Sequence, residues 1–154
     1  MNIGIIIHSK NGHTYSAALK LQEKLISKNH KVNIEKVTPV GDAHPGVKNL
    51  QLETKPEVSG YDGLIFAAPV WAFALSPVMA TYLSGISSLK GKKIAAFVTM
   101  GFPWASLGGN RSIKQLKQSC EAKGGTVMTT EVITRSAQDE KIVGDVVEKL
   151  SGMF

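Results

Sequence analysis

The chain has 154 residues, of which 43% are hydrophobic and 19% charged, and its formal net charge is +6. This length and composition fit one compact domain with a sizeable core, so we expect residues 1–154 to form a single domain. Its only cysteine, Cys120, can form neither an internal disulfide nor a metal site by itself, which is typical of a reducing compartment. Nothing at the N-terminus resembles an export signal, so we expect a cytoplasmic protein.

The positive charge does not by itself predict binding to nucleic acid. The Lys and Arg residues are spread along the chain without a long run of like charges, which is typical of a solvated surface. The uncharged stretch from Gly63 to Leu89 is interrupted by Pro69 and Pro77, which argues against a transmembrane span. We therefore expect neither a nucleic acid partner nor insertion into a membrane.

The chain begins with a buried strand at residues 2–8, because its aliphatic run is apolar on both faces. A helix follows, and its inner face is expected to carry Ala17, Ala18, Leu21, Leu25 and Ile26. A more exposed strand is expected at residues 31–37. Residues 38–60 are rich in Pro, Gly and charge, so we expect them to cross the sheet with only a short helical turn near residues 47–52.

The second half repeats the alternation of strands and helices. Buried strands are expected at residues 62–68 and 93–100, separated by a helix from about Pro77, since proline suits a first helical turn. A helix with Ile113, Leu116 and Cys120 on its inner face precedes a fifth strand at residues 126–134. The last helix starts with Asp139 and Glu140, and its inner face is expected to carry Ile142, Val143, Val146, Val147 and Leu150.

Strands that alternate with helices pair in parallel and place helices on both faces of the sheet. The sequence therefore predicts an α/β fold with a doubly wound sheet. In such a sheet, ligands bind beyond the carboxyl ends of the strands, where the strand order reverses. This directs attention to the loops at residues 9–14, 69–76 and 101–110.

The first of these loops, "SKNGHT", has the composition of an anion site. It offers hydroxyls at Ser9 and Thr14, an amide at Asn11 and a flexible Gly12, all at the start of a helix. Unpaired N–H groups and a partial positive charge at a helix N-terminus suit a phosphate. An ordinary N-cap turn uses the same residue types, so the loop alone leaves both interpretations open. The absence of a Walker motif and of a G-x-G-x-x-G motif after a strand disfavours an ATPase, a GTPase or a dinucleotide-binding domain.

Both tryptophans, Trp71 and Trp104, lie in the other two loops, accompanied by Phe73 and Phe102. Flat apolar side chains suit a planar ring, although a loop aromatic can also cover the core beneath it. A phosphate loop and two aromatic loops on one sheet edge together predict a phosphorylated planar cofactor.

At these residues the chain resembles the short-chain flavodoxins and flavodoxin-like FMN proteins, over nearly its whole length. The loop "SKNGHT" is similar to the family's phosphate loop, with Asn11 in place of the usual central hydroxyl. The segment "YDGLIFAAPVWAFALSPVMATYL" is similar to the third strand and the loop beside the flavin, and "KKIAAFVTMG" to the fourth strand. The chain departs from the family in its positive charge and in the composition of the second flavin loop.

The resemblance implies a single flavodoxin-like domain with a five-stranded parallel sheet in the order 2-1-3-4-5, and it implies bound FMN. The FMN phosphate would be held by Ser9, Asn11, Gly12, His13 and Thr14. One border of the flavin ring would be formed by Pro69, Val70, Trp71 and Phe73, and the other by Thr99, Met100, Gly101, Phe102 and Trp104. Lys10 is expected in solvent, and His8 is expected to be a structural histidine. No side chain is expected to be catalytic, because the chemistry would be that of the flavin.

The function implied by the resemblance is electron transfer by an FMN-binding flavoprotein, with a redox partner protein or a small-molecule electron acceptor. One alternative is an NAD(P)H-dependent FMN reductase or quinone-type oxidoreductase. A second is a flavin-free binding or regulatory module of the same fold, although a phosphorylated receiver would need acidic residues where His8 and Ser9 stand. The sequence is compatible with a monomer or a homodimer.

Overall fold

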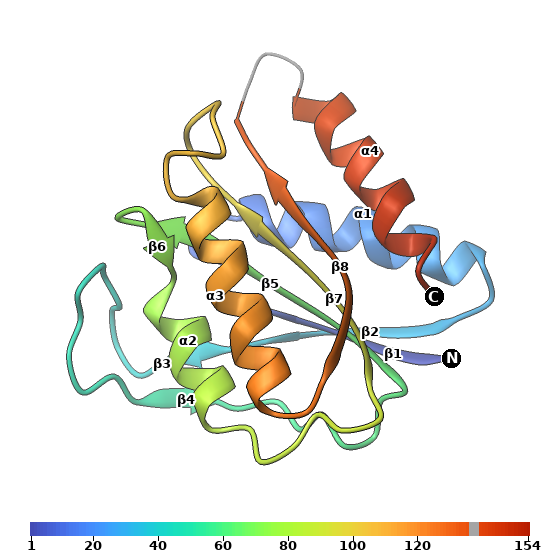
Figure 1. Cartoon of the computed structure of the whole chain (residues 1–154), viewed down its shortest axis with the longest axis horizontal. Helices are drawn as coiled ribbons and strands as arrows, with labels where there is room; N and C mark the ends of the chain where they lie inside the picture. The colour runs from blue at the N-terminus through green and yellow to red at the C-terminus, as the bar shows by residue number, and fades with distance from the viewer. Residues whose placement is uncertain (136–138) are drawn as a thin grey trace.

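The computed structural model describes residues 1–135 and 139–154, arranged around a central sheet (Figure 1). Its parallel strands are β1 (Asn2–Ile7), β2 (Lys31–Lys36), β5 (Gly63–Trp71), β7 (Lys93–Thr99) and β8 (Thr126–Ile133). They lie in the order β2-β1-β5-β7-β8, which is the predicted order 2-1-3-4-5. A further strand that the sequence did not predict, β6 (Ala74–Leu75), pairs antiparallel with the end of β5.

Helices cover both faces of this sheet, as a doubly wound α/β fold requires (Figure 1). The apolar sides of α1 (His13–Ser27) and α4 (Asp139–Ser151) pack on one face. Those of α2 (Pro77–Ser84) and α3 (Gly109–Ala122) pack on the other. In the ranges 1–135 and 139–154, no helix has both the length and the apolar composition needed to cross a membrane.

Strand β1 shows how one aliphatic run serves both layers. Ile3, Ile5 and Ile7 pack with α1 and α4, whereas Ile6 packs toward α2 and α3. All four side chains are fully buried. Because successive side chains of a strand point to opposite faces, a central strand needs apolar residues at every position rather than at every second one.

Helix α2 starts where proline predicted it. Pro77 occupies the first turn, and the preceding Ser76 is the N-cap, whose Oγ accepts a hydrogen bond from Met79 N at 3.3 Å. A proline loses no helical hydrogen bond at this position, and a serine N-cap satisfies one N–H group of the first turn. This start directs the chain from the sheet edge back across the face of the sheet.

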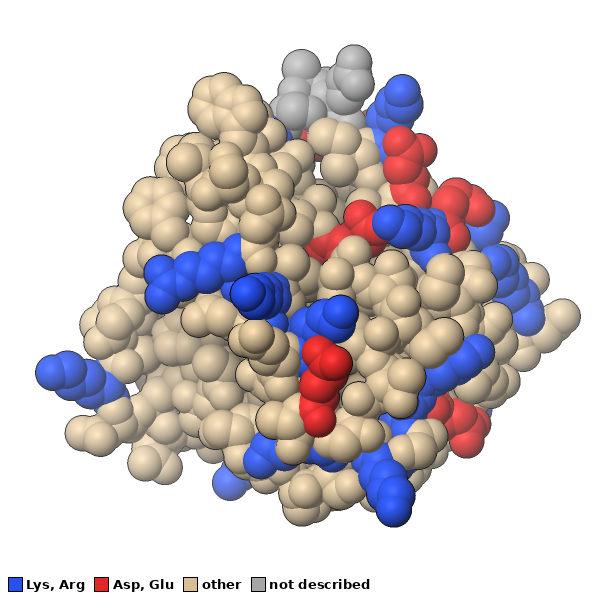
Figure 2. Space-filling model, in the orientation of Figure 1, with Lys and Arg blue, Asp and Glu red and all other residues tan. Residues whose placement is uncertain are grey.

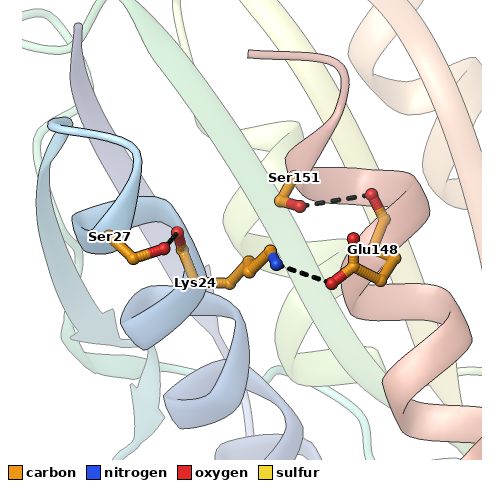
Figure 3. Close-up of polar contacts among 4 residues, drawn as sticks. All are labelled: Lys24, Ser27, Glu148 and Ser151. Atoms are coloured by element: carbon orange, nitrogen blue, oxygen red, sulfur yellow. Dashed lines mark hydrogen bonds and ion pairs between the residues drawn. The ribbon is translucent and has the colours of Figure 1, made fainter.

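Helices α1 and α4 lie side by side on their face of the sheet (Figure 3). Lys24 Nζ lies 2.7 Å from Glu148 Oε1, and the hydrogen bond from Lys24 lowers the pKa of the Glu148 carboxyl. The hydroxyls of Ser27 and Ser151 donate to backbone carbonyls one turn earlier in their own helices. Since the ion pair is exposed, the apolar contacts beneath it contribute more to the stability of this layer.

The crossing between β2 and β5 contains no helical turn at residues 47–52, so that prediction was wrong. It contains instead two short antiparallel strands, β3 (Thr38–Pro39) and β4 (Leu52–Thr54). Gly46 and Asn49 adopt left-handed φ angles of 77° and 55°, which a right-handed helix cannot accommodate. Residues in left-handed conformations therefore replace the expected helical turn in this segment.

Ile26 is also placed differently from the prediction, because 51% of its surface is exposed. An α-helix turns by about 100° per residue, so the residue that follows the buried Leu25 rotates away from the sheet. The other inner-face positions predicted for α1 are buried. In α3 and α4, Leu116, Cys120, Val146, Val147 and Leu150 are buried, whereas Ile113, Ile142 and Val143 are partly buried.

Candidate functional site

A cavity of about 470 Å³ opens at the carboxyl edge of the parallel sheet. This volume is within the range of small-molecule and cofactor sites. Its wall is formed by the loop after β1, the start of α1, the end of β5, the loop after β7, and the segments around the end of β8 and the start of α4. The lining residues are Ser9, Lys10, Asn11, His13, Thr14, Ser16, Lys20, Pro69, Val70, Trp71, Thr99, Met100, Gly101, Phe102, Ile133, Thr134, Arg135, Asp139, Glu140 and Val143.

The predicted site residues line this cavity with the exception of Gly12, Phe73 and Trp104. Gly12 forms the turn immediately before α1. Phe73 lies at the tip of the β5–β6 hairpin with 53% of its surface exposed, and Trp104 is 65% exposed in the loop after β7. The structure thus brings all three predicted loops to one cavity and leaves two of the predicted aromatic side chains outside it.

Helix α1 begins at the cavity with an N-cap residue that has no side chain to cap it. Its N-cap residue, Gly12, has φ 86°, and the first turn contains no acidic side chain. Ser9 Oγ accepts a hydrogen bond from Tyr15 N at 3.3 Å, within the first turn of the helix. The first N–H groups of a helix carry a partial positive charge, and Gly12 leaves them without a cap from the N-cap residue, so this end of the cavity is suited to an anionic group.

Two threonines join the first loop to the end of β7. Thr14 Oγ1 and Thr99 Oγ1 lie 2.8 Å apart, and both side chains are buried. A hydroxyl can donate one hydrogen bond and accept two, so each side chain keeps capacity for a further partner in the cavity. The pair fixes the distance between the start of α1 and the loop after β7.

Trp71 is held from two sides at the end of β5. The ring of the buried His8 meets it edge-on at a centroid distance of 5.1 Å, and Lys10 Nζ lies 5.5 Å from the centroid of the indole. Lys10 also donates a hydrogen bond to Ala43 O at 3.1 Å. Lys10 is exposed, as expected, but its ammonium contacts the Trp71 ring and the Ala43 carbonyl.

His8 is a buried structural histidine, in agreement with the sequence interpretation. Its Nδ1 lies 2.6 Å from Ser76 Oγ, and burial, together with the nearby Lys10 charge, lowers the pKa of His8 to about 4. Since Ser76 Oγ already accepts from Met79 N, its own proton is available for Nδ1. The ring is therefore neutral at physiological pH and acts as packing support behind Trp71.

Arg135 is a cavity residue that the sequence did not indicate. Its Nη1 lies 2.8 Å from His13 Nε2, and its backbone N donates to Phe102 O at 3.0 Å. A guanidinium can only donate, so Nε2 of His13 accepts. Arg135 follows β8, whose carboxyl end shares the sheet edge with those of β1, β5 and β7, and this shared edge is the signal that could have identified it.

The β5–β6 hairpin has an unusual turn beside the cavity. Its two turn residues, Ala72 and Phe73, have φ angles of 49° and 65°, the left-handed values of a type I′ turn that normally selects Asn and Gly. The ring of Phe73 stacks on that of Phe102 at a centroid distance of 6.2 Å and an interplanar angle of 12°. The hairpin thereby packs against the loop after β7.

The side chains of the described residues, 1–135 and 139–154, do not form a group of three or more His, Cys, Asp or Glu residues suited to a metal ion. The donors that surround the cavity are hydroxyls, amides, backbone N–H groups and cationic side chains. They are suited to an anionic organic ligand.

No family model and no curated protein matches this chain, but solved structures do. Oxidised flavodoxin 2 from Bacillus cereus is similar with a TM-score of 0.74 and 20% identity, over 99% of this chain and 97% of that one. A short-chain flavodoxin associated with a non-canonical PDU bacterial microcompartment has a TM-score of 0.73 and 15% identity, over 99% and 96%. A flavoprotein from Lactobacillus acidophilus NCFM, solved in complex with FMN, has a TM-score of 0.65 and 17% identity, over 94% and 97%. At these identities the similarity establishes the architecture of the chain.

Proposed function

We propose that this chain, which has the flavodoxin-like fold, binds FMN in the cavity at the carboxyl edge of its sheet and acts in electron transfer. The observation that carries the proposal is the composition of one cavity, which joins the N-terminus of α1 to a wall containing Trp71 and to the loop after β7. The N-terminus of α1 suits a phosphate, and the wall containing Trp71 suits a planar ring. The solved flavodoxins and the FMN-bound flavoprotein of the same fold add support.

The phosphate would lie at residues 9–14. The N–H groups at the start of α1 supply donors, and Ser9, Asn11 and Thr14 add side-chain donors. Gly12 contributes through its backbone, because φ 86° turns the chain into the helix without a side chain that could hinder the phosphate. Arg135, whose guanidinium donates to His13 Nε2, adds positive charge at the same end.

The flavin ring would lie between the end of β5 and the loop after β7. Pro69, Val70 and Trp71 form one border, and Thr99, Met100, Gly101 and Phe102 form the other. Nothing lies within 4 Å of where a Cβ of Gly101 would stand, so the backbone there has room to turn a carbonyl toward the ring. FMN, when bound, supplies the electron-accepting and electron-donating chemistry.

The direct test is fluorescence titration of FMN with the purified protein. Stacking on protein groups is expected to quench the fluorescence of FMN, and the purified protein is expected to be yellow. Riboflavin, which lacks the phosphate, is expected to bind at least about tenfold more weakly, since the charge-assisted hydrogen bonds to the phosphate contribute about 1.5–3 kcal/mol each. Equal affinity for FMN and riboflavin would contradict the assignment of residues 9–14 as the phosphate site.

A glycine pair provides a matched control. Gly12→Val is expected nearly to abolish FMN binding, whereas Gly46→Val is expected to leave it unchanged. Both glycines have positive φ angles, 86° and 77°, and both have open space around the missing Cβ, so the two substitutions introduce similar backbone strain. Equal FMN binding by both variants would show that Gly12 has no role in the site.

An anaerobic titration distinguishes electron transfer between proteins from direct reduction of the flavin by a nicotinamide cofactor. Addition of NADH or NADPH to the FMN-loaded protein is expected to leave the flavin oxidised. Rapid bleaching of the flavin would instead identify an NAD(P)H-dependent reductase.

A further inference from the structure

The charges of this chain are unevenly distributed in a way that matters for its surface. From Gly63 to Cys120 the sequence contains six cationic side chains and no Asp or Glu. This stretch forms β5, β6, α2, β7 and all but the last two residues of α3, together with the two loops that border the cavity. This segment therefore provides no carboxylate to neutralise its own lysines and arginine.

The cations of α3 lie on the outside of the molecule. Arg111, Lys114 and Lys117 are all exposed, and none of them forms an ion pair with any residue in 1–135 or 139–154. Their spacing of three residues places them along one side of the helix. In Figure 2, blue side chains lie across the face where Figure 1 shows α3.

The acidic groups on neighbouring elements leave this charge largely uncompensated. Glu121 stands at the far end of α3, and Glu131 of the adjacent β8 is paired with Lys149. Asp139 and Glu140 belong to the cavity wall at the start of α4. The side of α3 that follows its N-terminus thus has a positive potential directed at solvent.

Exposed aromatic side chains adjoin the same helix. Phe73, Phe102 and Trp104 are 53%, 49% and 65% exposed, and Phe73 stacks on Phe102. The hairpin that carries Phe73 packs against α3: Leu75 N donates to Gln115 Oε1 at 3.0 Å, and Arg111 lies one turn before Gln115 on the same side of the helix. We name the combined surface the aromatic–basic face, and it consists of Phe73, Phe102, Trp104, Arg111, Lys114 and Lys117.

The aromatic–basic face is continuous with the cavity, because Phe102 belongs to both. Exposed aromatic residues and arginine are enriched in the cores of protein–protein interfaces, and complementary charge accelerates association and orients the partner. We propose that an acidic redox protein docks on the aromatic–basic face and exchanges electrons with the cavity past Phe102. The redox character of the partner rests on the proposed function, whereas the sign of its charge rests on the surface itself.

A protein partner fits this face better than a nucleic acid. Only three cations line the helix, and two of the three aromatic rings are stacked on each other, so neither of these two rings presents both of its faces to a base. Affinity for duplex DNA rises with the number of phosphates that cationic side chains neutralise, and three cations provide few such contacts. The aromatic groups would instead fill shallow hollows in a protein surface.

The test is an NMR titration of the full-length ¹⁵N-labelled chain with two redox proteins of opposite charge, at low ionic strength. An acidic [2Fe–2S] ferredoxin is expected to shift the amide signals of residues 72–73 and 101–108 and of α3, and added salt should weaken the effect. A basic cytochrome c is expected to leave these signals unchanged. Preference for cytochrome c, or shifts centred on the lysines of α1 and β2, would overturn the proposal.

Two triple variants with the same change in net charge distinguish the effect of this face from the effect of net charge. R111E/K114E/K117E is expected to lower the affinity for ferredoxin at least about tenfold, whereas K28E/K31E/K55E, on exposed positions elsewhere, should lower it far less. Equal losses in both variants would overturn the proposal. Trp104→Ala is expected to weaken docking about tenfold, with Leu19→Ala as an exposed apolar control. Unchanged docking of the Trp104 variant would overturn the aromatic part.

Two further arms complete the test. A duplex or single-stranded DNA oligonucleotide that binds the same residues more tightly than ferredoxin would assign the face to nucleic acid and overturn the proposal. The amide signals report docking whether or not FMN is present. Ferredoxin docking without FMN binding would therefore contradict the proposed function and support the docking surface. FMN binding without ferredoxin docking would support the proposed function and overturn the docking surface.

Discussion

A Cβ atom on Gly108 would lie 2.4 Å from the Cα atom of Phe73, so the loop before α3 and the β5–β6 hairpin touch backbone to backbone. Gly108 also has φ 102°, a left-handed value that a residue with a side chain rarely adopts. This contact holds together the two loops that form one side of the cavity. It explains why a glycine immediately precedes α3.

Replacement of Gly108 by Ala is expected to lower the free energy of unfolding by about 2 kcal/mol or more, because the clash adds to the backbone strain. Urea unfolding followed by circular dichroism measures the change. Gly144→Ala is the control: this glycine lies inside α4 with open space around it, and alanine there should raise stability by about 0.5–1 kcal/mol. Wild-type stability of the Gly108 variant would mean that the two loops separate freely.

Ala72→Asn is expected to stabilise the protein by about 0.5–1 kcal/mol, because asparagine tolerates the left-handed φ of 49° better than alanine. Ala80→Asn provides the matched comparison, since Ala80 is exposed inside the right-handed helix α2 and the same change should lower stability there. Thermal unfolding of both variants gives the two signs. A loss of stability at position 72 would contradict the type I′ assignment of the hairpin turn.

His8 is expected to make stability depend on pH. The unfolded chain binds the His8 proton with the ordinary pKa of 6.5, whereas the folded chain binds it only near pH 4, so protonation favours unfolding. The stability from neutral His8 is complete above about pH 6.5 and is lost between pH 6.5 and about 4, by up to about 3 kcal/mol. Urea unfolding across this pH range should show the loss in the parent and in the exposed-site control His44→Asn. In His8→Asn the free energy of unfolding should change less steeply with pH. An unchanged pH dependence in this variant would contradict the role of His8.

Thr14→Ala is expected to weaken FMN binding about tenfold and to lower stability by about 1 kcal/mol, since it leaves the buried hydroxyl of Thr99 without its partner at 2.8 Å. Thr14→Ser keeps the hydroxyl and should restore most of both properties. FMN fluorescence titration and urea unfolding of the two variants provide the measurements. If serine does not rescue binding, the methyl group of Thr14 matters more than its hydroxyl.

Cys120 is expected to resist thiol reagents in the folded protein. It is fully buried in the layer of α2 and α3, and burial raises the pKa of its thiol to about 12, which keeps the reactive thiolate scarce. Labelling with a chromogenic disulfide reagent should therefore be slow in buffer and rapid in urea. Fast labelling in buffer would indicate local opening of α3.

The local signals in the sequence were sufficient to predict the central sheet and the helices that cover it. The aliphatic run of β1 has no polar face, so it could only be a central strand, and Pro77 predicted the start of α2, which the structure places at that residue. The same reasoning placed the loops after β1, β5 and β7 on one edge, because parallel strands share a carboxyl edge. The helical turn expected at residues 47–52 and the buried position expected for Ile26 were wrong, because local composition does not determine φ angles, nor does it mark where the buried stripe of a helix ends.

The sequence by itself determined the elements, their order and the loops that surround the cavity, because hydrophobic period, proline and glycine act within a few residues. Only the tertiary structure decided which side chains meet. Arg135 reaches His13 across 122 residues of chain, and Gly108 packs on Phe73 across the hairpin. Phe73 and Trp104 are directed to the surface rather than into the cavity. Such contacts depend on how segments that are far apart in the sequence pack together at the sheet edge. No pattern within a few residues of sequence specifies that packing.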